Sequence, residues 1–489
     1  MLHQNYLTGY TDGAMRKNTS PWLHQLDSAR IQKKLNMDIG TDVAIVGAGI
    51  AGTATAFFTL KYTDKKVVML EKFKLAHGAT GHNAGQVVSY FERGFAGLVE
   101  EFGIELAATG QRAIDESWEL MDEMYTGSEL DIPFSRFTGY GGLTSIQQIL
   151  WNLQNNYEKR RGGLTPSRMH IADSFYVGQI PQKYEGLYEI VPHADVLRLL
   201  ETERAEYIAV TLGQKGCINS ALFCQEVIAY LLRMFPGRFS LFEHTDVRKI
   251  ILRHNHAILD AETHTVTAGR VVLCTNGFEN LHIVNETGLD IDARYHHMIS
   301  GRIGYMSGYL EKMNKLPIEI SYYNTPDVGI DNWYYYLTRR PFEYEKGHDH
   351  NLVCLGGFDT KIEEKILYSH DDEYPEEIAE KMDEFIHEVY SLKPNHKIDY
   401  VFTWHGLMGY TANGVRLIGP EPQNPVLLYN LGCNGVGILP SVYGSKKISR
   451  HLNGEQVEKS IFDVPSRAIE LQPAPNFGLA GNSTRERVK

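Results

Sequence analysis

Three glycines near the start of the chain have the spacing that binds a dinucleotide. Gly47, Gly49 and Gly52 form the pattern G-x-G-x-x-G, with Ala51 between the second and the third. The first glycine permits a tight turn, the second lets the backbone approach a diphosphate, and the third lets a helix pack closely on a strand. The helix that follows would direct its N-terminal amides at the phosphates. We therefore expect a dinucleotide site here.

The sequence around these glycines indicates a strand, a helix and a second strand. Apolar runs occupy residues 43–46 and 67–70, and residues 50–62 between them have the composition of a buried helix. Short apolar runs are typical of parallel strands buried on both faces. Glu71 ends the second run, about 20 residues after the glycines, where a ribose hydroxyl would be held. A glutamate there disfavours a 2′-phosphate, so we expect NAD or FAD rather than NADP.

The segment after Glu71 distinguishes between these two cofactors. An NAD-binding domain would continue into another helix and strand, whereas this chain continues through Lys72 into a small, polar segment, HGATGHNAGQ, at residues 77–86. This segment resembles the D-amino-acid oxidase-like superfamily of FAD-dependent oxidoreductases, in which it runs from the diphosphate to the isoalloxazine ring. It is most similar to the γ-glutamylputrescine oxidase-like branch, where an arginine commonly stands at the position of His82.

Three further segments resemble the same superfamily and follow its order. Residues 217–232 resemble a helix of the superfamily that comes just before its adenine-binding strands. Residues 243–278 resemble those strands, which hold the adenine at Val247 and return through VVLCTNG. Residues 402–454 resemble the C-terminal flavin segment, in which a loop at residues 432–437 opens a helix. The dipole of that helix would stabilise negative charge on the reduced ring.

The resemblance implies which residues contact FAD. Each of them stands in one of the segments described above. They are Gly47, Gly49, Ala51, Gly52, Glu71, Lys72, Thr80, His82, Asn83, Ala84, Gly85, Gln86, Val247, Thr275, Asn276, Gly277, Gly432, Asn434, Gly435, Val436 and Gly437.

His82 is where this sequence departs most clearly from the branch it resembles. In dimethylglycine dehydrogenase-like members, a histidine at the corresponding place bonds covalently to the flavin 8α-carbon. The more similar branch binds FAD noncovalently, so noncovalent FAD is expected and a link through His82 is the alternative. In a third interpretation, the imidazole donates a hydrogen bond to a phosphate or to the flavin edge. Gly406 stands near the place of the flavin cysteine of sarcosine oxidases, which argues against a cysteinyl link.

The cofactor segments alternate with stretches that do not resemble nucleotide-binding sequence. The expected fold class is therefore α/β (α+β): a discontinuous Rossmann-type FAD-binding domain with a second, antiparallel-sheet substrate domain. A length of 489 residues also exceeds what one core supports. The boundaries that we expect are 1–40 for an N-terminal extension, 41–110, 191–289 and 399–455 for the FAD-binding domain, 111–190 and 290–398 for the substrate domain, and 456–489 for a loosely ordered tail.

Four residues are candidates for catalysis on the substrate side of the flavin. Arg302 and Tyr305 lie in GRIGYM, which resembles a family strand that places an arginine and aromatic residues above the ring. Tyr335 belongs to NWYYYLTRR, whose alternate residues would face opposite sides of a strand. Trp404 lies in the C-terminal flavin segment. Either face of the tyrosine run could line the pocket, and ordinary sheet packing is the alternative for each tyrosine.

Three arginines could bind a substrate carboxylate through a bidentate contact: Arg302, Arg339 and Arg340. For each of them, a solvated surface position is the ordinary alternative. With the aromatic residues, they favour a secondary amine or an amino-acid derivative without choosing between the two.

Composition argues against several other classes of protein. The net charge is −12 and basic residues form only short clusters, so nucleic-acid binding is not expected. Five cysteines without a C-x-x-C pair, and 20 histidines without a metalloprotease pattern, predict neither a metal site nor a disulfide framework. We see no signal peptide and no run long enough for an integral membrane span, so we expect a cytoplasmic protein. The expected partner is a small amine or amino-acid substrate, and the oligomeric state is not predicted.

The expected reaction is oxidation of the C–N bond of an amine or amino-acid derivative by hydride transfer to flavin N5. Oxygen or an electron carrier would reoxidise the flavin, and this chemistry needs few protein groups. Two alternatives keep the cofactor: a 2-hydroxy-acid or glycerol-phosphate type dehydrogenase of the same fold, and a non-catalytic FAD-binding protein. A dehydrogenase that uses only NAD is disfavoured by residues 77–86.

Overall fold

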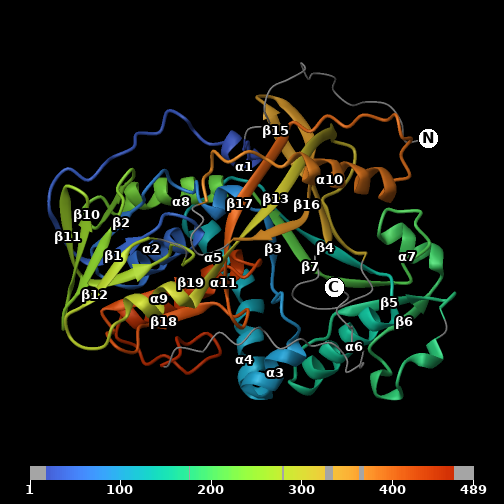
Figure 1. The fold of residues 1–489 in the computed structure, drawn as a ribbon, viewed down its shortest axis with the longest axis horizontal. Helices are drawn as coiled ribbons and strands as arrows, with labels where there is room; N and C mark the ends of the chain where they lie inside the picture. Colours follow the sequence, from blue (N-terminus) through green and yellow to red (C-terminus); the bar gives the residue numbers. More distant parts are fainter. Residues whose placement is uncertain (1–17, 176, 278–279, 325–333, 363–367, 467–489) are drawn as a thin grey trace, which may run out of the picture.

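Two β-sheets form the framework of the molecule (Figure 1). This computed structural model describes residues 18–175, 177–277, 280–324, 334–362 and 368–466.

The strands of the first sheet are β1 (Ile39–Val46), β2 (Val67–Leu70), β8 (Phe239–Phe242), β9 (Lys249–Leu252), β10 (Ala257–Ala261), β11 (His264–Leu273), β12 (His282–Asn285), β18 (Leu417–Pro420) and β19 (Leu427–Leu431). They follow the order β12-β9-β10-β11-β1-β2-β8, with β19 also paired to β11. Because β1 is parallel to both β2 and β11, their carboxyl ends meet at one edge. Parallel α/β sheets bind their ligands at this edge.

The strands of the second sheet are β3 (Gln86–Val88), β4 (Phe134–Leu143), β5 (Arg168–Ala172), β6 (Glu189–Val191), β7 (Ala209–Ile218), β13 (Ile299–Lys312), β14 (Ile318–Tyr323), β15 (Tyr335–Glu345), β16 (His348–Lys361) and β17 (Phe402–Thr411). Their order is β17-β13-β16-β15-β14-β4-β7-β5-β6, with β3 paired to β7. Most neighbours are antiparallel, and β4–β14 and β5–β6 are parallel.

The helices are α1 (Pro21–His24), α2 (Ile50–Tyr62), α3 (Phe95–Phe102), α4 (Ile104–Asp115), α5 (Ser117–Gly127), α6 (Ile146–Arg161), α7 (His193–Leu199), α8 (Ser220–Met234), α9 (Asp292–Met298), α10 (Glu376–Val389) and α11 (Ile438–Leu452). Helix α2 is buried from Ile50 to Leu60, which explains its apolar composition on all sides. It packs against α11, and their core includes residues of both sheets. The two sheets are therefore joined through one continuous apolar core.

The division of the chain between the sheets differs from the expected boundaries. We assigned residues 41–110, 191–289 and 399–455 to the cofactor domain, yet β3, β7 and β17 belong to the second sheet. Strand β17 pairs with β13, and β7 pairs with β4, along their whole lengths. Local sequence indicates that a segment is a strand, but its partners depend on contacts that are distant in sequence.

Both ends of the described chain pack against the core. Trp22 is fully buried although it lies in the expected N-terminal extension. Within the expected loose tail, Ile461 and Phe462 are buried, and the Phe462 carbonyl accepts a hydrogen bond from the amide of Ile418 at 2.8 Å. The tail prediction was therefore wrong for residues 456–466, and residues 467–489 lie outside the described part.

None of the described helices has both the length and the hydropathy that a membrane crossing requires.

Candidate functional site

A cavity of about 2350 Å³ is lined by residues of both sheets and of the helices between them. Pockets for small ligands usually measure about 300–1,000 Å³. The space is therefore large enough for a dinucleotide together with a second molecule.

The glycine fingerprint lines this cavity at the carboxyl end of β1. A Cβ at Gly47 would lie 2.7 Å from the carbonyl oxygen of Cys274, and Gly47 has a φ of +100°. A Cβ at Gly52 would lie 2.0 Å from the carbonyl oxygen of Gly47. Gly52 does not line the cavity, so it acts by letting α2 pack against the turn.

The N-terminus of α2 joins the fingerprint to the segment at residues 77–86. Gly49 is the N-cap, and a Cβ there would lie 2.8 Å from Oγ1 of Thr80. The same Thr80 oxygen accepts a hydrogen bond from the amide of Ile50 at 2.9 Å. The amide of Ala51, at the cavity wall, belongs to the first helical turn, which has no preceding turn to pair with. These features fit a helix N-terminus that receives an anionic group.

Glu71 directly follows β2, and both Glu71 and Lys72 line the cavity. The carboxylate of Glu71 accepts hydrogen bonds from the amides of Ala48 at 2.8 Å and Phe73 at 3.0 Å. These contacts hold the carboxylate at the cavity wall, where the sequence predicts a ribose hydroxyl. Val247 also lines the cavity.

The carbonyl of Asn83 holds the centre of the 77–86 segment in place. It accepts hydrogen bonds from two indoles, Trp22 at 2.6 Å and Trp404 at 3.2 Å. The side-chain oxygen of Asn83 accepts a hydrogen bond from the amide of Gly85 at 2.7 Å. Trp404 does not line the cavity, so it positions this segment instead of facing a substrate.

Arg340 also holds this segment, contrary to the expectation that it could bind a substrate carboxylate. Its guanidinium donates to the carbonyls of Ala84 at 2.8 Å, Gly85 at 3.1 Å and Ile218 at 2.9 Å. It also lies 4.5 Å from the ring centroid of Trp22. Because these contacts occupy the guanidinium on the protein side, Arg340 supports the cavity wall from behind.

His82 lies at the cavity wall and is almost fully buried. Its Nδ1 lies 3.0 Å from the carbonyl oxygen of Gly78, and its ring stacks on His370 with centroids 4.6 Å apart. Burial, followed by the neighbouring His370, lowers the pKa of His82 to about 3. The imidazole is therefore neutral, with Nδ1 protonated because a carbonyl only accepts. Nε2 is left as an acceptor, which does not suit the expected donation to a phosphate or flavin edge.

The turn after β11 and the loop before α11 form a third part of the wall. The side-chain oxygen of Asn276 accepts a hydrogen bond from the amide of Cys433 at 2.8 Å. The side-chain oxygen of Asn434 accepts one from the amide of Thr411 at 2.8 Å. Asn276 and Asn434 have φ values of +64° and +48°, and their side chains fix these unusual turns.

Helix α11 begins at this loop and brings positive charge to it. Gly437 is the N-cap, and Ile438 lines the cavity. Arg416 is buried beside the loop and donates to carbonyls of Asn430 and Gly432 at 2.8 and 3.2 Å. Burial lowers its pKa to about 10, so it stays charged at neutral pH. No carboxylate lies within ion-pair distance of Arg416 in the described parts of the chain.

The structure brings most of the expected cofactor residues together around the cavity. Those that line it are Gly47, Gly49, Ala51, Glu71, Lys72, Thr80, His82, Asn83, Ala84, Gln86, Val247, Thr275, Asn276, Gly277, Gly435, Val436 and Gly437. Gly52, Gly85, Gly432 and Asn434 lie behind the wall and shape it. Contact of each residue with FAD stays a prediction.

Of the four expected catalytic residues, Arg302 alone lines the cavity. Tyr305 faces the other side of the second sheet, against Tyr374, with ring centroids 5.8 Å apart. Tyr335 also faces away, stacked on Phe385 at 3.8 Å. For Tyr305 and Tyr335 the choice of face was therefore wrong, since strand alternation alone does not indicate which face meets the cavity.

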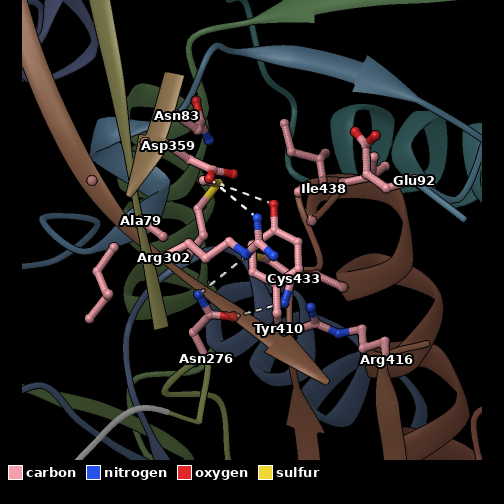
Figure 2. Close-up of a pocket in the computed structure, with 18 of the residues that line it drawn as sticks. Ala79, Asn83, Glu92, Asn276, Arg302, Asp359, Tyr410, Arg416, Cys433 and Ile438 are labelled. Atoms are coloured by element: carbon pink, nitrogen blue, oxygen red, sulfur yellow. Dashed lines mark hydrogen bonds and ion pairs between the residues drawn. The ribbon is translucent and has the colours of Figure 1, made fainter. Parts of the chain in front are cut away.

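Arg302 and Arg339, two of the arginines that could bind a substrate carboxylate, also lie on different sides of the second sheet's wall: only Arg302 lines the cavity. Arg339 forms a bidentate pair with Glu201, at 2.7 and 2.8 Å, away from the cavity. Arg302 lines the cavity beside Tyr410 and lies 3.3 Å from a carboxylate oxygen of Asp359 (Figure 2). The cavity arginine therefore already has a carboxylate partner.

Sequence reasoning missed a group of cavity residues at the second sheet. They are Tyr90, Glu92, Met306, Tyr323, Tyr334, Tyr336, Asp359, Met408 and Tyr410. The sequence left the face of Tyr334 and Tyr336 open as one that could line the pocket, although neither residue was chosen as a candidate; no motif surrounds Glu92. Figure 2 shows Glu92, Arg302, Asp359, Tyr410 and Arg416 around one part of the cavity.

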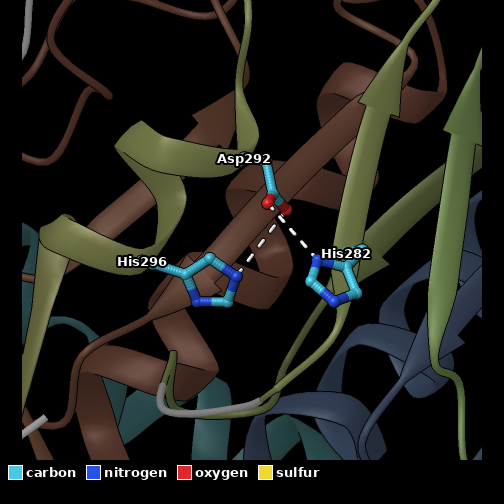
Figure 3. A group of neighbouring side chains, drawn as sticks. All are labelled: His282, Asp292 and His296. Atoms are coloured by element: carbon cyan, nitrogen blue, oxygen red, sulfur yellow. Dashed lines mark hydrogen bonds and ion pairs between the residues drawn. The ribbon is translucent and has the colours of Figure 1, made fainter.

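A cluster near β12 and α9 has donor atoms that could hold a metal ion (Figure 3). Asp292 lies 3.5 Å from Nδ1 of His282 and 3.6 Å from Nε2 of His296. The Asp292 carboxylate also accepts a hydrogen bond from the amide of Ile283 at 2.6 Å. These contacts explain the cluster as an anchor between α9 and β12 without an ion.

Comparison with known proteins identifies relatives along most of the chain. A family model described as FAD dependent oxidoreductase matches residues 42–450. The probable oxidoreductase OrdL of Haemophilus influenzae is 20% identical over 438 residues, covering 87% of this chain and 86% of that protein. Gamma-glutamylputrescine oxidoreductase of Escherichia coli is 26% identical over 192 residues, which cover 36% of this chain and 44% of that protein.

Solved structures share the fold at low identity. Glycine oxidase from Geobacillus kaustophilus superposes with a TM-score of 0.62 and 16% identity, covering 88% of this chain and 99% of that one. L-proline dehydrogenase from P. horikoshii gives 0.61 and 14%, covering 86% and 95%. L-alpha-glycerophosphate oxidase from Mycoplasma pneumoniae, with FAD bound, gives 0.55 and 15%, covering 87% and 99%. The expected fold class and superfamily are confirmed.

Proposed function

From the premise that the chain belongs to the FAD-dependent oxidoreductase family, we propose that it oxidises the C–N bond of an amine or amino-acid derivative. Oxygen or an electron carrier accepts the electrons. One partial relative is named for gamma-glutamylputrescine, and one structure of the same fold is a glycine oxidase, which supports an amino compound as the substrate class.

The observation that carries this proposal is one connected cavity with two chemically different ends. The fingerprint glycines and the start of α2 line one end, where a diphosphate would bind. Tyrosines of β14 and β15, with Glu92, line another part, where a second molecule has room. A nucleotide site that opens directly onto a side-chain pocket fits a redox enzyme better than a passive cofactor carrier.

The protein groups near residues 432–437 fit the needs of a flavin. When bound, FAD accepts the two electrons and the hydrogen that leave the substrate carbon. The first amides of α11 and the charge of Arg416 provide a positive environment for negative charge that accumulates nearby. The neutral His82 and the indole-anchored Asn83 line the wall of the same cavity.

The charges in the cavity favour an amine over a 2-hydroxy acid or a glycerol phosphate. The arginines that could bind a substrate carboxylate are already engaged, and Arg339 and Arg340 make their contacts away from the cavity. Arg416, which has no carboxylate partner in the described residues, lies at the loop where the flavin would bind. Arg302 has Asp359 as its partner. An amine requires only a carboxylate or aromatic face, and both are present.

We also propose that FAD binds noncovalently. His82 is neutral and its Nε2 has a free lone pair, which is compatible with either form of the flavin. The relatives named above do not distinguish the two. In acid-precipitated holoenzyme we expect a colourless pellet and a yellow supernatant; a yellow pellet that turns colourless in a His82→Gln variant would establish the covalent alternative.

Anaerobic bleaching of the purified yellow protein tests the reaction. A panel of primary and secondary amines, amino acids, 2-hydroxy acids and glycerol 3-phosphate is mixed with the oxidised holoenzyme, and the flavin absorbance is followed. We expect amines or amino acids to bleach the flavin, and free FAD in the same buffer is the control. Bleaching by hydroxy acids alone would favour the alternative dehydrogenase. Bleaching by dithionite but by no member of the panel would contradict the proposal and favour a non-catalytic FAD-binding protein.

A further inference from the structure

We propose that Glu92 and the tyrosines around it bind a positively charged nitrogen of the substrate. The inference rests on the proposed function and narrows its substrate class to amines that enter the cavity as cations. No motif in the sequence surrounds Glu92, so the argument depends on where the fold places it.

Glu92 lies directly against the loop that precedes α11. A Cβ at Gly435 would lie 2.9 Å from Cγ and 3.4 Å from Oε1 of Glu92, and 3.0 Å from the hydroxyl of Tyr410. Both side chains line the cavity. The carboxylate of Glu92 is therefore at the junction of the loop and the tyrosine-lined part of the cavity (Figure 2).

The carboxylate of Glu92 has no basic partner in the described chain. The hydroxyl of Tyr334 donates to its two oxygens, at 3.2 and 3.4 Å. Lys215 acts on it electrostatically but already pairs with Glu319 at 2.7 Å. Burying a carboxylate without a counter-charge is costly, and a ligand cation would remove that cost.

The other cavity charges do not supply this counter-charge. Arg302 pairs with Asp359, and Arg93, which follows Glu92 in the chain, pairs with Glu101. Burial raises the pKa of Glu92 to about 7, which is the direction expected for an unpaired carboxylate. A bound cation would lower it again and keep the group ionised.

The surrounding aromatic rings suit the same ligand. Tyr323 and Tyr334 stack with centroids 4.6 Å apart, and Tyr336 meets Tyr334 at 5.9 Å and 60°. The ring of Tyr90 already accepts a cation, since Nζ of Lys215 lies 4.6 Å from its centroid. Aromatic faces next to a carboxylate form the arrangement that recognises ammonium groups.

Binding of an unreactive cation to the oxidised holoenzyme tests this inference separately from the reaction. The protein is titrated separately with tetramethylammonium and with tert-butanol, a neutral molecule of similar size. In each titration, the change in the flavin absorption spectrum gives the dissociation constant. We expect the wild type to prefer the cation, and Glu92→Gln to bind it on the order of 10- to 100-fold more weakly with little change for tert-butanol. Glu92→Asp, which keeps the charge, should lose less.

Glu100→Gln is the matched control, because Glu100 also lines the cavity but is exposed to solvent. It removes the same charge, and we expect the dissociation constant for tetramethylammonium to change less than about threefold. Unfolding temperature and flavin content show whether each variant is folded. The inference is overturned if the wild type does not prefer the cation, or if Glu92→Gln and Glu100→Gln weaken it equally. Because the probe is not oxidised, failure of the bleaching panel would leave this result standing, and the reverse also holds.

Discussion

The two ends of the cavity are built in different ways. At the fingerprint end, close backbone approaches form the wall: a Cβ at Gly47 would meet the carbonyl oxygen of Cys274, and a Cβ at Gly49 would meet Oγ1 of Thr80, so neither position has room for a larger residue. At the tyrosine end, side chains arrive from β13, β14, β15, β16, β17 and the segment after β3. The first end tolerates almost no substitution, whereas the second can change its ligand by exchange of single side chains.

Gly52→Ala should break the fingerprint end and have the largest effect. A Cβ there meets the carbonyl oxygen of Gly47 at 2.0 Å, and a backbone atom cannot move aside without disturbing the turn. We expect destabilisation of more than about 3 kcal/mol and loss of bound flavin, measured by chemical denaturation and by the flavin-to-protein absorbance ratio. Gly40→Ala is the control, since nothing lies within 4 Å of its Cβ position. Normal flavin content in Gly52→Ala would refute this account.

Exchange of two arginines should separate a residue that supports the wall from one that lines the cavity beside its carboxylate partner. Arg340→Lys loses most of the contacts to the carbonyls of Ala84, Gly85 and Ile218, so we expect a cost of about 2–4 kcal/mol and weaker flavin binding. Arg302→Lys should retain its flavin and alter only the substrate dependence of bleaching. The unfolding temperature and the dissociation constant of the flavin are measured for Arg340→Lys and Arg302→Lys. Equal loss of flavin in both variants would contradict the distinction.

Replacement of His82 should have the smallest effect on the free energy of unfolding, and this effect should be seen only at acidic pH. The folded-state pKa of His82 is about 3, below its usual 6.5, so the unfolded chain binds a proton that the folded chain does not. Stability from this group is present above pH 6.5 and decreases as the pH falls from 6.5 towards 3. Between pH 7 and pH 5 we expect the wild type to lose about 1–2 kcal/mol more than His82→Gln, measured by urea unfolding. Identical pH dependence in the two proteins would exclude this role for His82.

Local structure was largely predictable from the sequence. The helix at 50–62 and the strand at 67–70 occur at the predicted residues, because a mostly apolar, buried helix and short apolar strands have strong local signals. The turn at Gly47 and the close approach at Gly49 were also predictable from glycine spacing. Placement of residues 77–86 beside the fingerprint depended on the resemblance to a family, not on periodicity.

The substrate side was much less predictable. Tyr335 was chosen as a catalytic candidate, but its neighbours Tyr334 and Tyr336 line the cavity instead. Alternation along a strand shows that two faces exist but not which of them meets the cavity. Trp404 was a catalytic candidate and Arg340 was one of three arginines that could bind a substrate carboxylate, yet both hold the backbone at Asn83 to Gly85. Glu92 was missed because its environment comes from residues more than 200 positions away, such as Tyr334.

The sequence by itself determined the nucleotide-binding unit and the family, since a phosphate site depends on backbone conformation that a few glycines impose locally. Only the tertiary structure decided which tyrosines, arginines and carboxylates face the cavity. That outcome depends on how the strands pair and which sheet face is covered, and these are long-range contacts that local residue patterns do not encode.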